Sequence, residues 1–282
     1  MKLLRLNHRT FEGVVAEVSN EIINSAPQVD SLSWQGKQDE EGKFSTREIQ
    51  NLVFEIAMPW PLAILQQTMK PNLPWADEHF AERVGGVPLN PPPSNENWPF
   101  KQNGHADHLD KDGQFSHTYP ERYWPKIANG GKGLYGPERN VGIRFLYGDL
   151  KDLVKVLIED PATRQAYLPV WFPEDLTAAT GGERVPCTLG YHFMIRRGRI
   201  HVTYLIRACD FLRHFRDDVY MTIRLAQWVR EQLDKAGIFI ELGNLTMHVM
   251  SMHVFEKDMD LVRFQYGAHQ EAFQRAFNER LL

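Results

Sequence analysis

Two alternating stretches joined by a tight turn constrain the fold of this chain more than any other feature. In the run that ends at Ile195, and again from Arg199 to Arg207, apolar and polar side chains alternate. That period is typical of strands that bury one face. The Arg197-Gly198 pair between the two runs indicates a turn, and a polar loop and a helical pattern follow them. The segment therefore predicts a β-hairpin that leads into a functional site, because loops held by regular elements commonly carry function.

A cysteine directly after a proline, Pro186-Cys187, lies at the mouth of the first alternating run. The chain has only 2 cysteines, which cannot form a disulfide framework, and their spacing does not suit a zinc site, so we expect no metal. A buried cysteine is most often an inert small hydrophobe. Its position at the start of the hairpin nevertheless makes Cys187 the candidate nucleophile, and a reducing compartment suits a working thiol.

Hydrophobic periodicity outside the hairpin predicts an α/β (α+β) protein with a mixed sheet. Apolar residues at helical spacing predict helices over 10–23, 62–69, 150–158 and 217–235, and strand-like stretches cover 163–171, 238–242 and 245–253. Ser45 to Glu48 has the form of a capping box, which predicts a helix from there through Ala57 with Glu55 beside its apolar stripe. The segment 70–133 is rich in proline and glycine and is expected to form irregular insertions that cover the site.

Length and charge narrow the class of protein further. A chain of 282 residues with 43% hydrophobic residues can bury the core of a single domain, which we expect to span 1–282. The formal net charge of -4 argues against nucleic-acid binding. No apolar run reaches the length of a membrane span, and the first residues lack a signal-peptide core, so the expected location is the cytoplasm.

Three linked motifs resemble the thymidylate synthase superfamily over roughly 149–253. They are the runs Arg164 to Asp175, Arg184 to Ile195 and Gly243 to His253, in the order that the superfamily has them. Details of the site resemble its cytidylate (CMP or dCMP) 5-hydroxymethylases. The resemblance implies a thymidylate synthase-like mixed β-sheet with flanking helices, a homodimer formed sheet to sheet, and 5,10-methylenetetrahydrofolate as co-substrate.

The resemblance assigns the covalent step and the phosphate site to residues of these motifs. Cys187 matches the nucleophile that adds to C6 of a pyrimidine nucleoside monophosphate and activates C5. Arg207 matches a phosphate ligand, and Arg164 matches an arginine that enters the partner subunit's site. Gln165 stands where the family has a second arginine, so another basic residue such as Lys37 or Arg47 would have to compensate.

Other matches concern the base and the sugar. Asp218 stands where thymidylate synthases have an asparagine that pairs with uracil, and a carboxyl group there suits the exocyclic amine of cytosine. The alternative is that Asp218 only caps the helix that follows it. Ala208 replaces a serine and leaves room for a ribose 2′-hydroxyl, which favours CMP over dCMP. His248 matches the histidine that contacts the sugar, whereas Cys209 matches a position without chemistry.

The remaining matches concern proton transfer and co-substrate binding. Glu55 is the match to a helix glutamate that organises water, with a surface position as the alternative. Tyr119 and Tyr135 compete for the catalytic tyrosine. Trp75 and Asp210 match co-substrate contacts, and Asp210 also matches a catalytic position.

The expected function is therefore transfer of a one-carbon unit to C5 of a cytidine monophosphate, with water completing a hydroxymethyl group. If Trp75 matches the second of two synthase tryptophans, Asn72 occupies the position that supports hydride transfer. The ending Phe277 to Leu282 lacks the synthase closing motif, which also favours water. The alternatives are a dCMP or dUMP C5 methyltransferase and a non-catalytic nucleotide-binding homologue.

Overall fold

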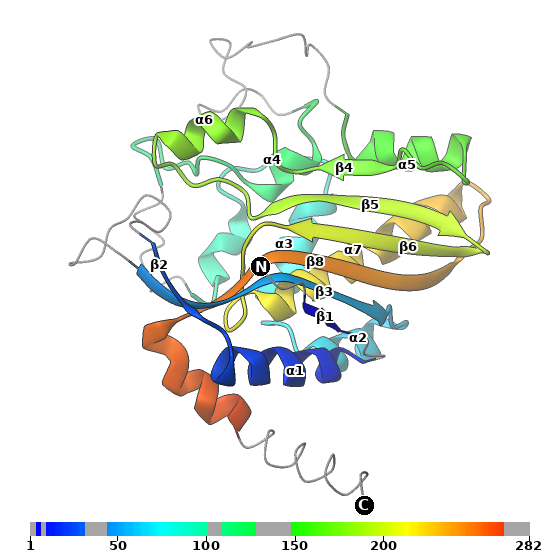
Figure 1. Cartoon of the computed structure of the whole chain (residues 1–282). Helices are drawn as coiled ribbons and strands as arrows, with labels where there is room; N and C mark the ends of the chain where they lie inside the picture. Colours follow the sequence, from blue (N-terminus) through cyan, green and yellow to red (C-terminus); the bar gives the residue numbers. More distant parts are fainter. Residues whose placement is uncertain (1–3, 7–9, 32–43, 101–108, 128–147, 268–282) are drawn as a thin grey trace, which may run out of the picture.

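A mixed β-sheet forms the centre of the computed structural model, which describes residues 4–6, 10–31, 44–100, 109–127 and 148–267. The strands follow the order β1-β3-β8-β6-β5-β4, with β2 on β3 and β7 on β8 (Figure 1). Parallel pairs (β1 with β3, β6 with β8) alternate with antiparallel ones (β3 with β8, β5 with β6), which confirms the predicted mixed sheet. The strands are β1 Leu4–Leu6, β2 Gln28–Ser31, β3 Phe44–Ala57, β4 Tyr167–Pro169, β5 Thr188–Arg196, β6 Arg199–Ile206, β7 Cys209–Asp210 and β8 Glu241–Phe255.

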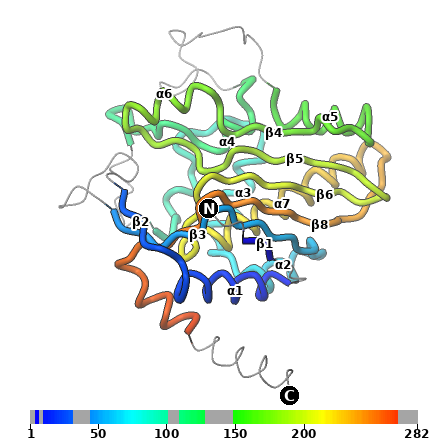
Figure 2. The backbone as a smooth tube through the Cα atoms, in the orientation of Figure 1, coloured from blue at the N-terminus to red at the C-terminus, as the bar shows by residue number. Residues whose placement is uncertain are grey.

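Helices flank this sheet, and the longest of them, α7, packs along one of its faces (Figure 2). Their bounds are α1 Phe11–Asn24, α2 Leu62–Met69, α3 Trp75–Val84, α4 Tyr119–Tyr123, α5 Leu150–Glu159, α6 Glu174–Thr180 and α7 Phe215–Lys235, with 3-10 turns at Pro93–Asn97 and Glu256–Asp258. Helix α1 buries the predicted stripe of Phe11, Val14, Val15, Val18 and Ile22, and Thr10 caps it. Helices α2 and α5 also lie where the periodicity predicted them.

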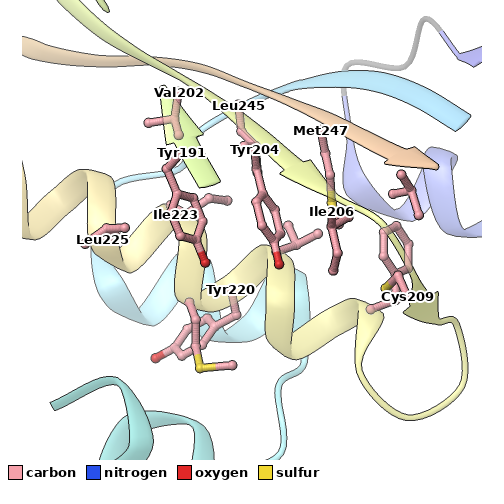
Figure 3. Packing of buried hydrophobic residues seen from close by; sticks show 14 of the residues in the cluster. Tyr191, Val202, Tyr204, Ile206, Cys209, Tyr220, Ile223, Leu225, Leu245 and Met247 are labelled. Carbon is pink, nitrogen blue, oxygen red and sulfur yellow. The ribbon is translucent and has the colours of Figure 1, made fainter. Parts of the chain in front are cut away.

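The core lies between α7 and the inner face of the sheet. Figure 3 shows Tyr191 and Tyr204 side by side and directed from the sheet toward α7, with their rings stacked at 4.7 Å. Ile223 approaches the same layer from α7 and is fully buried. On the outer face, side chains such as Thr203 and Thr246 remain partly exposed. No described helix covers that face (Figure 1).

The predicted hairpin is confirmed. Strands β5 and β6 pair antiparallel across Arg197, which has a φ of 51°, and Gly198, which has a φ of 69°. The pairing shifts between Thr188 and Gly190. A Cβ at Gly190 would lie 2.6 Å from the Leu168 carbonyl, so β4 can pair closely with β5 there only because residue 190 is glycine.

The predicted helix over 45–57 is wrong, because this segment forms the long strand β3. Leu52, Phe54 and Ile56 are buried with the period of a strand. Asn51, with a φ of 55°, interrupts that period, and Ile49 before it is buried with the opposite parity. Ile49 and Leu52 are therefore three residues apart, which is a helical spacing, and for this reason the sequence predicted a helix here.

Other boundaries also differ from the predictions. Segment 70–133 was expected to be irregular, yet it contains α3 and α4, whose short apolar faces give weak periodic signals. The strand expected over 163–171 is limited to Tyr167–Pro169, and the two strands expected at 238–253 form the single strand β8. Within the described residues, no helix combines the length and apolarity that a membrane-spanning segment needs.

Candidate active site

The candidate nucleophile lies where β5 begins and β6 ends. Cys187 directly precedes β5 and is only partly buried. Its carbonyl accepts a hydrogen bond of 2.9 Å from the backbone N of Arg207, which follows β6. The Arg207 guanidinium donates from Nε to the carbonyl of Pro186 at 2.9 Å and from Nη2 to that of Val185 at 3.1 Å. Arg207 therefore fixes the loop that presents the thiol. Its Nη1 donates no hydrogen bond to a described residue and can bind a ligand.

Opposing charges surround the Cys187 thiol. Burial raises its pKa, and the carboxyl groups of Asp218 and Asp210 act in the same direction. The guanidinium groups of Arg207 and Arg184 oppose this by stabilising the thiolate. Arg184 was not among the predicted site residues, although it opens the motif that contains the cysteine. A bound substrate that neutralises either carboxyl group would favour the thiolate.

A line of three hydroxyl groups runs beside the cysteine. The hydroxyl of Tyr119, on α4, lies 2.8 Å from Thr188 Oγ1, and the same Oγ1 lies 2.9 Å from the hydroxyl of Tyr204. Thr188 is fully buried and directly follows Cys187, so its backbone ties this line to the nucleophile. The structure thus brings Tyr119 to the site. Tyr135 lies outside the described residues.

Asp218 faces the site from within α7. The helix begins at Phe215, and the backbone N of Asp218 already donates to the His214 carbonyl, so Asp218 lies inside the first turn. The alternative that its side chain caps the helix is therefore wrong. Its Oδ2 lies 3.6 Å from Cys209 Sγ. Burial raises the pKa of Asp218 to about 7, while the cation of Arg83 opposes that rise.

The neighbouring carboxylate, Asp217, has a separate and structural role. It accepts hydrogen bonds from the backbone N of Asn72 at 2.8 Å and from Asn72 Nδ2 at 2.7 Å. These bonds attach the start of α7 to the segment between α2 and α3. Both the backbone N and the side-chain amide of Asn72 are therefore engaged by Asp217.

Helix α3 places the predicted Trp75 on a face with two residues that the sequence interpretation missed, His79 and Arg83. Trp75, His79 and Arg83 are spaced by four residues, and all three are buried. The Trp75 and His79 rings stack at 5.1 Å, and the His79 ring meets that of Tyr119 edge to face. The Arg83 guanidinium carbon lies 3.9 Å from the centre of the Tyr119 ring. This spacing was the only signal in the sequence, and the irregular composition around α3 obscured it.

The protonation of His79 follows from its partners. Burial lowers its pKa to about 4, so the imidazole is neutral. Burial acts to raise the pKa of Glu82, but hydrogen bonds from His79 and Ser94 hold that pKa below its usual range. Ser94 Oγ donates its only proton to Glu82, so Nδ1 of His79, at 3.1 Å, must be the donor to Ser94. The lone pair of the imidazole is therefore on Nε2.

Asp210 and Ala208 lie between β6 and α7, next to Arg207. Asp210 accepts hydrogen bonds of 3.0 Å from the backbone N of Leu212 and of Arg213, and it pairs with the Arg213 guanidinium at 2.9 Å. These contacts hold the loop between β7 and α7. Ala208 is partly exposed and adds no polar group beside Arg207.

Glu55, His248 and Arg164 were predicted as site residues, but they lie away from the residues around Cys187. Glu55 is exposed on the strand β3, where it accepts hydrogen bonds from Asn244 at 2.9 Å and Thr246 at 3.2 Å. Its assignment to a helix glutamate is a wrong placement, because the helix does not exist. His248 lies on the outer face, with Nε2 3.4 Å from Asn51 Oδ1.

Arg164 is exposed and lies near the far end of β5. The Arg164 carbonyl lies within hydrogen-bond distance of His192, and the carbonyl of neighbouring Thr163 accepts a hydrogen bond from Arg196. A strand rise of ~3.3 Å per residue places Arg164 roughly 25 Å from Cys187. Arg47, considered as a compensating cation, is paired with Glu256 at 3.0 Å. Lys37 lies outside the described residues. Among the described residues, no group of acidic, histidine or cysteine side chains is placed to hold a metal ion.

A partly buried thiol beside arginines, a carboxyl group with a raised pKa and a tyrosine is suited to covalent catalysis on a polar, anionic substrate. The model of the thymidylate synthase family matches residues 106–276. This chain belongs to the thymidylate synthase family.

Individual relatives agree with that assignment. A putative thymidylate synthase of Methanothermobacter thermautotrophicus is 24% identical over 230 residues, which cover 81% of this chain and 87% of the relative. One from Methanosarcina acetivorans is 24% identical over 57% of this chain and 72% of its own length. The thermostable thymidylate synthase A from Bacillus subtilis has the same fold, with a TM-score of 0.64 and 17% identity over 92% of this chain and 84% of that one.

The charges around the thiol predict its reactivity. Replacing Arg184 by methionine should raise the pKa of Cys187, because a cation that stabilises the thiolate is removed. Alkylation by iodoacetamide at neutral pH should then slow, by about tenfold if the pKa rises by one. The modified Cys187 peptide is followed by mass spectrometry. Arg199→Met, which removes an arginine paired with Glu241 at the other end of β6, is the control. Equal alkylation rates in the parent and Arg184→Met would contradict the electrostatic account.

Proposed function

We propose that this protein transfers a one-carbon unit from 5,10-methylenetetrahydrofolate to C5 of a cytidine monophosphate and that water completes a hydroxymethyl group. Membership of the thymidylate synthase family supports a folate-dependent one-carbon transferase. The observation that carries the choice of base is the Asp218 carboxyl group, which faces the site with a raised pKa and does not cap its helix.

The proposed steps need no oxidant or reductant. The Cys187 thiolate adds to C6, and the electrons of the C5–C6 double bond attack the methylene carbon of the folate. Loss of the C5 proton and departure of the folate nitrogen leave an exocyclic methylene group and tetrahydrofolate. The oxygen of water then adds to the methylene carbon, a water proton is released, and the thiolate leaves C6.

Asp218 is the group that we assign to the exocyclic amine. An ionised carboxylate only accepts hydrogen bonds, which suits the N4 amine of cytosine and repels O4 of uracil. With a pKa of about 7, Asp218 is increasingly ionised above neutral pH. A protonated carboxyl could also donate to O4, so discrimination against uracil depends on ionisation.

We assign the phosphate to Arg207, as the resemblance indicated, and to Arg184, which the structure places beside it. Arg207 Nη1 and the partly buried Arg184 lie beside the nucleophile and supply positive charge for the phosphate. His248, which the resemblance matched to the sugar, lies on the outer face of the sheet, so we assign no sugar contact to it. Ala208 supports CMP over dCMP, because no side-chain hydroxyl fills the space beside Arg207.

The co-substrate is assigned to the aromatic side of the site. The partly exposed Trp98 and His214 rings, which stack at 6.1 Å, offer a flat surface that fits a pteridine or an aryl group. We assign contacts with the folate to Trp75 and Asp210. The folate supplies the methylene group, and the chain supplies the thiol, the charge and the orientation.

Tritium release tests the reaction directly. CMP labelled with tritium at C5 should release tritium to water when methylenetetrahydrofolate is present, and Cys187→Ser should release none while binding CMP within about tenfold of the parent. Product mass and the absence of dihydrofolate distinguish hydroxymethylation from methylation. A methylated product would establish the synthase-type reaction, and no release from any pyrimidine nucleotide would favour a binding protein without catalysis.

The choice of base is tested at Asp218. Asp218→Asn should lower the ratio of CMP to UMP kcat/KM by at least about tenfold, because an amide can donate to O4 and one unsatisfied partner costs ~1–3 kcal/mol. In the parent, selectivity for CMP in binding should rise as the pH increases through about 7, where Asp218 ionises, and it should stay constant in the variant. A parent that prefers UMP, or a variant with unchanged selectivity, would contradict this assignment.

We also propose a homodimer formed through the outer faces of the sheets. That face is not covered by a described helix, and the exposed Arg164 lies too far from Cys187 to reach its own site. In the dimer, Arg164 would enter the partner's site and bind its phosphate.

Complementation tests the shared site. Arg164→Met and Cys187→Ser should each be inactive, whereas mixed dimers of the two should regain activity, because one of the two sites then holds both native residues. Mixing either variant with itself is the control. A fully active monomer in sedimentation, or mixing without recovery despite confirmed subunit exchange, would show that each site is complete within one chain.

A further inference from the structure

The side chain of Arg83 is a buried cation that forms no salt bridge with a described residue, although the Asp218 carboxyl group lies near enough to interact with its charge. Arg83 is 4% exposed, and no described residue hydrogen-bonds its buried Nε. Arg122 also has a buried Nε without a partner, but its Nη atoms bind the Asp175 carboxylate at 2.6 and 2.8 Å, whereas Arg83 forms no such ion pair with a described residue. A buried guanidinium donor without an acceptor is costly, so its retention points to an acceptor that arrives with a ligand.

The neighbours of Arg83 place that acceptor in the active site. The guanidinium carbon lies 3.9 Å from the centre of the Tyr119 ring, and the Tyr123 hydroxyl lies against the same group. Tyr119 is hydrogen-bonded to Thr188, which follows the nucleophile. Asp218 is close enough for the charge of Arg83 to oppose the rise in its pKa. Arg83 therefore faces the region between the tyrosine and the carboxyl group.

The chemistry of cytosine supplies the acceptor that this pair requires. Its N4 amine is a donor, which the Asp218 carboxylate can accept, and the adjacent ring nitrogen N3 is an acceptor, which a carboxylate cannot serve. A guanidinium beside the carboxylate supplies the missing donor in a fixed geometry. In uracil, N3 carries a proton and would meet a second donor.

We propose that Arg83 donates a hydrogen bond to N3 of the bound cytosine and so forms, with Asp218, the two-point reader of the base. This rests on the proposed use of a cytidine monophosphate. It adds a donor from α3 to the acceptor from α7, and it gives the unpartnered donor of Arg83 an acceptor.

An analogue that differs at one atom gives the sharpest test. In 3-deazacytidine monophosphate a C–H replaces N3. The parent should bind this analogue at least about tenfold more weakly than CMP, because the donor of Arg83 is left unpaired. Arg83→Met should bind CMP about as weakly as the parent binds the analogue, and it should no longer distinguish the two nucleotides. Binding is measured by calorimetry without folate, so turnover is not required.

The matched control is Arg224→Met, since Arg224 also lies between α3 and α7, over the Phe80 ring at 4.7 Å, but pairs with Asp77. It should retain the full discrimination between CMP and the analogue. Arg83→Lys, which preserves the charge, is the second variant if the methionine variant does not fold, and it should reduce the discrimination.

The failure of this proposal is distinguishable from that of the proposed function. If the parent prefers CMP but Arg83→Met, or the folded Arg83→Lys, discriminates against the analogue as the parent does, the assignment of Arg83 to N3 is overturned and the function stands. If the parent prefers UMP, the cytidine assignment fails, and the role of Arg83 at N3 fails with it.

Discussion

The hydrogen bonds between Arg207 and the chain segment before β5 hold the site together. The backbone of Arg207 binds the Cys187 carbonyl, while its guanidinium binds the carbonyls of Val185 and Pro186. The thiol therefore has a fixed position relative to the ends of β5 and β6. Because β6 also pairs with β8, the same bonds attach the nucleophile to the centre of the sheet.

Burial of charge is the second constraint on this site. The fold places carboxyl groups, guanidinium groups and a thiol together in a partly desolvated site. Each charge there changes the pKa values of the neighbouring groups. Asp218 illustrates the consequence, since burial raises its pKa to about 7 while Arg83 acts against the rise. A substrate that contributes both a donor and an acceptor can therefore alter the charge state of the site when it binds.

The two faces of the sheet have different tasks. The inner face builds the core with α7, and the tyrosines Tyr191 and Tyr204 stack there with their hydroxyl ends toward the helix (Figure 3). Tyr204 extends that layer to the site through Thr188. The outer face carries partly exposed polar side chains such as His248 and Thr246. The packing that stabilises the fold therefore also positions the residues beside the nucleophile.

The sequence by itself determined the hairpin, the motif around Cys187 and helices such as α1 and α5, because their periods and turn residues are local properties. It could not determine β3, since the interruption at Asn51 gives a strand a helical spacing. It named Trp75 but missed His79 and Arg83 on the same face of α3, because the role of Arg83 depends on its contact with Tyr119, which is distant in the chain. Only the tertiary structure decided that Asp218 is no cap, that Glu55 lies on an exposed strand, and which charges surround the thiol, because these depend on contacts between distant segments.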